Sequence, residues 1–218
     1  MARIMGGQFI SCIVLAAGES TRFPGGKLVQ KIRDNGVEKS LLRYLIDKYL
    51  RYDDVDEVVV VVGHDFTNII RAVGDTGVKY VYNPDYYKGM SFSVKTGVAS
   101  VLKYSDIVII HPGDVPFIKE STIGELLNKA IELYRSGKDF ILLPRYNGKG
   151  GHPLMVSRNL AKHILEITEE ERGLKGFLRR FTTYKIYIDT DDFGVVYDID
   201  EPKDLAEAEN LFGIKWIR

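Results

Sequence analysis

The chain has 218 residues, which suits one α/β domain with a sizeable core. Its 30 basic and 30 acidic residues cancel and no basic run is typical of a nucleic-acid-binding arm, so nucleic acid is not an expected partner. A single cysteine excludes an intramolecular disulfide and a cysteine-based zinc site. No stretch is apolar for long enough to predict a signal peptide or a membrane span, and we expect a cytoplasmic protein without membrane contact.

The first strand is predicted at residues 9–15, a short run rich in β-branched residues. Small residues at 16–18 follow, and their free backbone N–H groups favour an anion above the strand end. Arg22 and Lys27 add two positive charges at the same place. Together these features predict a cradle for the phosphates of a nucleoside triphosphate, with an ordinary glycine-rich turn as the alternative. Neither G-x-x-x-x-G-K-[ST] nor G-x-G-x-x-G is present, which disfavours a P-loop kinase and a dinucleotide-binding dehydrogenase.

Strands and helices alternate along the first two thirds of the chain, which is typical of βαβ units and a mainly parallel sheet. A nearly unbroken valine run at residues 57–62 predicts a strand buried on both faces. Other strands are expected at residues 78–82, 106–111, 139–143, 153–156, 184–188 and 195–199, with a hairpin over 27–31 and 37–39. Helices are expected over residues 41–50, 65–73, 122–135, 157–166, 174–181 and 202–211, with one more that ends at residue 102.

The chain contains neither an internal repeat nor a linker, and we predict a single α/β domain over residues 1–218 with helices on both faces of its sheet. Residues 1–8 are expected to form a flexible lead-in, and residues 145–151 a flexible glycine-rich loop. The helix starts are expected at the N-caps Ser40, Asp65 and Ser157 and at a capping box of Thr122 and Glu125.

Asp114 follows an apolar strand and is expected at its carboxyl end, beside the first loop if the two strands are neighbours. A carboxylate in that place is costly unless it is paired or bound to a metal. Nucleoside triphosphates arrive with Mg²⁺, whose shell takes one or two carboxylates, so Asp114 is a candidate metal ligand. The alternative is that Asp114 caps the turn that follows.

Asp198 and Asp200 lie two residues apart and would share one face of a strand. Either carboxylate could complete a metal site with Asp114. Asp200 also precedes Glu201-Pro202, so it could instead be the N-cap of the last helix. These two readings stay open at this point.

Residues 15–22 read Leu-Ala-Ala-Gly-Glu-Ser-Thr-Arg, with Lys27 five positions after the arginine. This loop resembles the signature of nucleotidyltransferases with a glycosyltransferase-A-like, Rossmann-like fold, and within them it is most similar to the molybdenum-cofactor cytidylyltransferases. Residues 89–97, 151–153 and 198–205 resemble further motifs of that family, in the same order. Pro24 departs from the pattern, because the family usually has glycine there.

The resemblance implies Mg²⁺-dependent nucleotidyl transfer from CTP to a phosphate acceptor, with molybdopterin favoured, and release of pyrophosphate. Enzymes that use CTP tend to carry alanine at the position of Ala17, where those that use GTP tend to carry glycine. GTP as donor, a sugar phosphate or other small phosphate as acceptor, and a non-catalytic nucleotide-binding module remain alternatives. Lys175-Gly176 depart from the family's pattern near the acceptor. A contact with a molybdoenzyme or a chaperone is a further expectation.

The same resemblance assigns roles to individual residues. It implies a catalytic set of Arg22, Lys27 and Asp114, a metal site of Asp114 and Asp200, and nucleotide binding by Leu15, Ala16, Ala17, Gly18, Lys27, Gly89, Ser93 and Asp114. His152 is expected to bind the acceptor phosphate, and the alternative is a histidine satisfied by backbone in a turn. The remaining histidines lack metal-ligand spacing and are expected to be structural or exposed: His64, His111 and His163.

Overall fold

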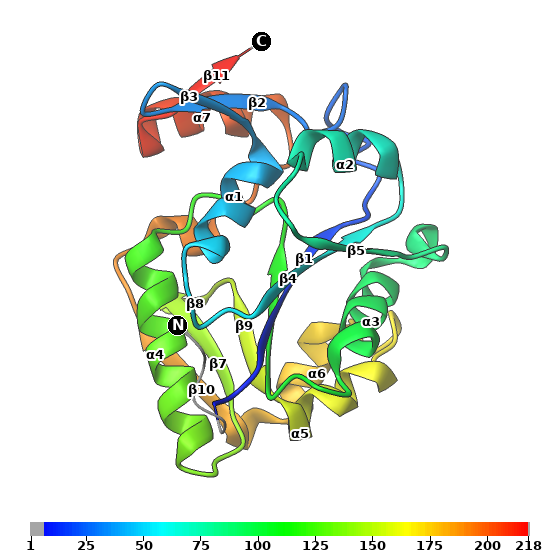
Figure 1. Cartoon of the computed structure of the whole chain (residues 1–218), viewed down its shortest axis with the longest axis vertical. Coiled ribbons are helices and arrows are strands. Elements are labelled where there is room, and N and C mark those ends of the chain that lie inside the picture. Colours follow the sequence, from blue (N-terminus) through cyan, green and yellow to red (C-terminus); the bar gives the residue numbers. More distant parts are fainter. Residues whose placement is uncertain (1–6, 218) are drawn as a thin grey trace.

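The computed structural model describes residues 7–217, which form a single α/β domain around an eight-stranded sheet (Figure 1). The order along this sheet is β10-β7-β9-β6-β1-β4-β5, with β8 paired to β7. Its strands are β1 Ile10–Ala16, β4 Glu57–Val62, β5 Lys79–Tyr82, β6 Ile107–Pro112, β7 Ile141–Tyr146, β8 Lys149–Gly150, β9 Leu154–Ser157 and β10 Lys185–Asp189. Most neighbours are parallel, as predicted; β8 and β9 run antiparallel to their partners.

Helices cover both faces of the sheet, which confirms the predicted layers (Figure 1). One face carries α1 Leu41–Leu50, α2 Phe66–Val73 and α4 Glu120–Arg135. The other face carries α3 Met90–Val101, α5 Arg158–Ala161 and α6 Leu174–Arg180. The last helix is α7 Pro202–Phe212, and short 3-10 turns lie at Tyr86–Lys88, Lys162–Glu166, Thr182–Tyr184 and Phe193–Val196. In the described part of the chain, no helix is both long and apolar enough to cross a bilayer.

The valine run in β4 explains why two helical layers form. Successive side chains of a strand point to opposite faces, so a strand covered on both sides must be apolar at every position. Val58, Val60 and Val62 join the core under α1 and α4, whereas Val59 and Val61 join the core under α3.

A small three-stranded sheet packs with α7 at one end of the molecule (Figure 1). Its order is β11-β2-β3, with β2 Lys31–Asp34, β3 Val37–Ser40 and β11 Lys215–Ile217. The turn between β2 and β3 has Asn35 and Gly36 at positive φ, as the predicted Asn-Gly turn requires. The cluster beneath this sheet includes Phe117 and Ile199, so it ties the two segments around Asp114 and Asp200 together.

Two predicted elements are wrong for the same physical reason, which is a contact with a distant segment. No strand forms at residues 195–199; Phe193–Val196 is a 3-10 turn, and the Ile199 N–H binds the carbonyl of Asp114 instead of a neighbouring strand. The capping box of Thr122 and Glu125 is also wrong. Helix α4 begins at Glu120, and Thr122 donates its hydroxyl to Asp192 Oδ2 at 2.8 Å.

The structure also differs from several smaller predictions. Residues 145–151 are not a flexible loop, because β7 continues to Tyr146 and turns back into β8. The first hairpin begins at Lys31 rather than at residue 27, and β11 was not predicted. The lead-in over residues 1–8 lies outside the described residues up to residue 6, and Gln8 within it is buried.

The expected helix caps are correct in position and differ in how they bond. Ser40 accepts from the Arg43 N–H, as a serine N-cap should. Asp65 precedes α2 with φ 52° and makes no cap bond; its carboxylate accepts from the Asn68 side chain. Ser157 precedes α5, but its hydroxyl donates to Asp139 at 2.9 Å.

Candidate active site

The carboxyl ends of β1, β4 and β6 lie side by side at one edge of the main sheet. In the registers, Ala16 pairs with Val62 and Leu15 pairs with Pro112. The loops that follow these strands therefore meet, as the prediction for Asp114 requires. This edge is where ligands bind in open α/β sheets.

A cleft of about 450 Å³ opens at this edge. It is lined by every residue predicted to bind nucleotide, metal or the transferring phosphate: Leu15, Ala16, Ala17, Gly18, Arg22, Lys27, Gly89, Ser93, Asp114 and Asp200. Tyr86 and Tyr87 also line it and were missed, and so does Met90 of the motif at residues 89–97. The place of the two tyrosines between Asn83-Pro84 and Gly89 was the available signal, since the segment follows β5 and leads into that motif. Lys27 and Asp200, 173 residues apart in sequence, thus share one hollow.

The loop after β1 is shaped by backbone conformation and one buried anchor. Ser20, Gly25 and Gly26 all have positive φ, so the chain turns tightly without regular structure. The Phe23 ring is buried and holds the loop to the small sheet, while Arg22 beside it stays exposed at the cleft.

Lys27 joins the two candidate metal ligands. Its ammonium lies 2.6 Å from Asp114 Oδ2 and 3.3 Å from Asp200 Oδ1. Arg22 Nη2 lies 3.0 Å from the other oxygen of Asp200. Two carboxylates therefore face two cations at the cleft. Lys27 and Asp114 are the sheltered pair, with 15% and 26% of their side chains exposed, whereas Arg22 and Asp200 are more open to solvent.

The backbone separates the roles of Asp200 and Glu201. Glu201 is the N-cap of α7, and Asp204 accepts from the N–H groups of both Asp200 and Glu201. Asp200 is therefore not the helix cap, and its carboxylate is free to face Lys27. The alternative that Asp200 is the N-cap of the last helix is therefore wrong.

Asp198 stands apart from the ion pairs of Lys27. It lines a second hollow of about 360 Å³ that shares Arg22 and Asp200 with the cleft. Burial raises the pKa of Asp198 above its usual value, and the nearby Asp114 carboxylate raises it further. Asp200, which touches Lys27 directly, is thus better placed than Asp198 to act together with Asp114.

Helix α3 begins beside the cleft. Its N-cap is Gly89, so Ser93 lies in the first turn and is not the cap. Ser93 is buried and accepts a hydrogen bond of 3.0 Å from the Asn83 side chain. Gly97 faces the sheet, and a Cβ there would lie 2.5 Å from Ile13, so glycine lets the helix pack closely.

His152 is the one predicted site residue that does not line the cleft. Its backbone N–H binds Val195, and its Nδ1 is buried without a hydrogen-bond partner among the described residues. Burial lowers the pKa of His152 to about 4. The ring stacks on His111 at a centroid distance of 6.4 Å, next to the Asp114 turn. Its role toward an acceptor stays a prediction.

The carboxylate pair suits a hard divalent cation that arrives with phosphate. Within residues 7–217 there is no group of three or more His, Cys, Asp or Glu side chains that could hold a metal ion unaided. Asp114 and Asp200 both contact one ammonium, so their charges already converge on one point. Mg²⁺ is usually held by one or two carboxylates plus substrate phosphates, and this donor set fits that pattern.

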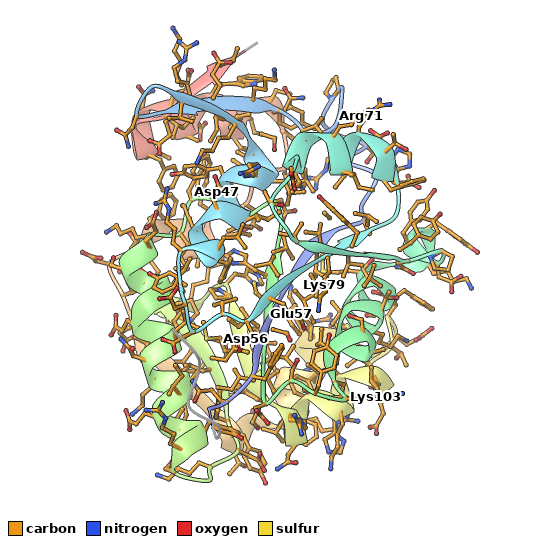
Figure 2. The ribbon with its side chains drawn as sticks, in the orientation of Figure 1. Asp47, Asp56, Glu57, Arg71, Lys79 and Lys103 are labelled. Atoms are coloured by element: carbon orange, nitrogen blue, oxygen red, sulfur yellow. The ribbon has the colours of Figure 1, made fainter. Side chains whose placement is uncertain are left out.

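Other ion pairs of the protein lie away from the cleft. Figure 2 shows Glu57 and Lys79 beside each other on the neighbouring strands β4 and β5, where they form an ion pair. Asp47 on α1 pairs with Lys39 and Arg43. None of these five residues lines the cleft.

A loop of small residues, two cations and two carboxylates gather at the ends of parallel strands, an arrangement that suits the binding of a nucleotide together with a metal ion. Residues 12–185 match the MobA-like NTP transferase domain. The chain belongs to this family.

Two relatives and one solved structure show how far the similarity extends. The chain is 25% identical over 204 residues to the molybdenum cofactor cytidylyltransferase of Escherichia coli (strain K12), covering 93% of this chain and 97% of that protein. It is 31% identical over 170 residues to the bifunctional protein GlmU of Caldicellulosiruptor saccharolyticus, covering 75% of this chain but only 35% of that longer protein. A nucleotidyl transferase from Methanothermobacter superposes with a TM-score of 0.75 at 20% identity, covering 94% and 98% of the two chains, which shows a common fold.

Proposed function

We propose that this protein transfers a cytidylyl group from CTP to a phosphorylated small molecule, with molybdopterin the favoured acceptor, and releases pyrophosphate. An oxygen of the acceptor phosphate would form a bond to the α-phosphorus of CTP. The bond from that phosphorus to the bridging oxygen of the β-phosphate would break, and pyrophosphate would leave with the electron pair.

The observation that carries this proposal is the contact of Lys27 with both Asp114 and Asp200 at the cleft. A triphosphate in the cleft would offer Lys27 a new anionic partner, and the two carboxylates would then be left for Mg²⁺. Mg²⁺, when bound, would neutralise charge on the phosphates. Lys27 and Arg22 would hold the charge that develops on the transferring and leaving phosphates, which is how most phosphoryl-type transfers are catalysed.

The loop after β1 would orient the triphosphate. Ala16 and Ala17 are buried and small, so the backbone at residues 16–18 can lie close to a phosphate. Such positioning lowers the entropic cost of bringing donor and acceptor together. No protein nucleophile is needed for a direct in-line transfer.

CTP is favoured over GTP on two grounds. The relative that this chain matches almost end to end is named a cytidylyltransferase. Ala17 also stands where family members that use CTP tend to carry alanine and those that use GTP tend to carry glycine. His152, beside Asp114 but outside the cleft, is proposed to contact the acceptor phosphate.

The test is pyrophosphate release from CTP, GTP, ATP or UTP, each with Mg²⁺ and with or without molybdopterin. We expect release only with CTP and acceptor together. Release with GTP would show that the assignment of CTP as donor is wrong, while the reaction type would stand. Release with a sugar phosphate in place of molybdopterin would show that the assignment of the acceptor is wrong. Nucleotide binding without pyrophosphate release under any combination would favour a non-catalytic binding module.

A further inference from the structure

The turn that carries Asp114 is held in place by hydrogen bonds to its backbone carbonyl groups. The Asp114 carbonyl accepts from the Ile199 N–H at 2.8 Å, and the Val115 carbonyl accepts from His111 Nε2 at 2.9 Å. Lys48 Nζ donates to the Pro116 carbonyl at 2.9 Å and to the Ile118 carbonyl at 2.6 Å. Four carbonyls within five residues are therefore directed away from the cleft.

The hydrogen bonds of His111 determine its tautomer. A carbonyl can only accept, so Nε2 carries the proton that reaches Val115. Nδ1 is then the acceptor, and the Tyr49 hydroxyl donates to it at 2.6 Å. Both side chains are fully buried. Tyr49 thus holds His111 in the one form that can bind the turn.

Two of the supporting side chains come from one neighbouring helix. Lys48 and Tyr49 are consecutive residues near the end of α1, and Lys48 is 6% exposed. Helix α1 is itself packed against β1 and β4 in the main core. The turn is therefore tied to a rigid element, which leaves the Asp114 side chain directed at Lys27 in the cleft.

We propose that His111, oriented by Tyr49, and Lys48 are positioning residues that hold Asp114 where it can bind a metal–nucleotide complex. This inference rests on the proposed function, because it assumes that Asp114 is a metal ligand. Groups that orient a metal ligand typically change metal affinity by about 10- to 100-fold when they are removed. A part played only in stability would leave that affinity unchanged in the folded variant.

The experiment compares His111→Leu, which removes the donor to Val115, with His111→Gln, which keeps an N–H donor at a similar place. Mn²⁺ binding in the presence of CTP is measured by electron paramagnetic resonance, and CTP binding without metal by calorimetry. We expect His111→Leu to weaken Mn²⁺ binding by about tenfold or more, His111→Gln to recover most of it, and metal-free CTP binding to stay near the wild-type value. Val73→Ala, which alters the same core from helix α2 and lies outside the cleft, is the matched control and should bind Mn²⁺ as the wild type does.

Asp114→Asn is measured in parallel to distinguish the positioning role of His111 from the metal site itself. If Asp114→Asn loses Mn²⁺ binding while folded His111→Leu retains it, the positioning role is wrong and the metal site stands. If Asp114→Asn binds Mn²⁺ with CTP like the wild type, the proposed metal site itself is wrong. Should His111→Leu not fold, Tyr49→Phe keeps the ring and removes only the hydroxyl, and wild-type Mn²⁺ affinity in that variant would equally overturn the inference.

Discussion

Lys27 Nζ lies 2.6 Å from Asp114 Oδ2 although 87 residues separate the two in sequence. The parallel pairing of β1 and β6 brings them together, because each residue lies in the loop after one of these neighbouring strands. The same ammonium reaches Asp200, so three distant segments meet at one charge. The predictions below follow from this junction and from the core that supports it.

Replacing Lys27 with methionine should reduce kcat by about 10²- to 10³-fold, because a preorganised charge for the transition state is lost. Pyrophosphate release under saturating CTP measures this effect. Lys103→Met is the matched control, because Lys103 is an exposed lysine that does not line the cleft (Figure 2). Turnover of Lys27→Met within about twofold of the wild type would rule out this role for the lysine.

Lys27→Met should also bind Mn²⁺ more tightly than the wild type when no nucleotide is present. In the wild type the ammonium neutralises Asp114 and Asp200, whereas the variant leaves two carboxylates without their shared cation. Electron paramagnetic resonance of free Mn²⁺ gives both affinities. Equal affinities in the two proteins would show that Lys27 does not compete with the metal for these carboxylates.

Asp200→Asn should weaken Mn²⁺–CTP binding more than Asp198→Asn. Asp200 shares Lys27 with Asp114, whereas Asp198 lines the neighbouring hollow. Titration of Mn²⁺ into each CTP-saturated variant compares the two carboxylates directly. A larger loss in Asp198→Asn would reverse the assignment of the second ligand.

Gly97→Ala should destabilise the fold by about 1–3 kcal/mol, because overpacking forces side chains or backbone to shift. The added methyl would lie 2.5 Å from Ile13 and 2.9 Å from Val61, both in the core beneath α3. Urea unfolding gives the change in free energy. Gly124→Ala in α4 is the control, since its nearest neighbour is the movable hydroxyl end of Tyr52 at 3.1 Å, and an equal loss in both variants would argue against crowding at Gly97.

Acid should destabilise the protein partly through His111. Burial lowers the pKa of His111 to about 3, with a further lowering by the nearby His152, whereas an unfolded histidine titrates at about 6.5. Between these values the unfolded chain binds more protons, so the free energy of unfolding falls as the pH drops from 6.5 toward 3. The loss reaches about 1.4 kcal/mol per pH unit at most from this group.

The measurement for this prediction is urea unfolding at pH 6.5, 5.5 and 4.5. His111→Gln should lose less stability across this range than the wild type, because its side chain does not titrate. His64→Gln, at an exposed histidine, is the control and should follow the wild type. Parallel curves for the wild type and His111→Gln would show that the buried imidazole is not a source of acid sensitivity.

The parts of this protein that could be predicted from sequence are those determined by local pattern. The valine run of β4 needs cover on both faces whatever its neighbours are, and the small residues after β1 form a ligand loop by their own geometry. Asp114 was found because it follows an apolar strand, whereas Asp200 was assigned by the resemblance of residues 198–205 to a family motif. Their meeting at Lys27 depends on strand order, which the sequence did not determine: Asp114 was expected beside the first loop only if the two strands were neighbours, and β1 and β6 are.

The parts that could not be predicted depend on partners distant in the chain. Asp192 accepts from the Lys119 N–H at 2.7 Å and from Thr122, 70 residues away, so α4 starts where another segment supplies its cap. His111 was expected to be structural or exposed and proved to be buried and structural; its tautomer depends on Tyr49, 62 residues away. No pattern around residue 111 encodes that partner.

The most direct test of the central claim follows the phosphorus atoms of CTP. The protein is incubated with Mg²⁺, molybdopterin and CTP labelled with ³²P at either the α- or the γ-phosphate. The account predicts that α-label appears in the acceptor product and γ-label in pyrophosphate, and that Asp114→Asn produces neither. Transfer of γ-label to the acceptor, or α-label that remains in CTP, would contradict nucleotidyl transfer from CTP by this cleft.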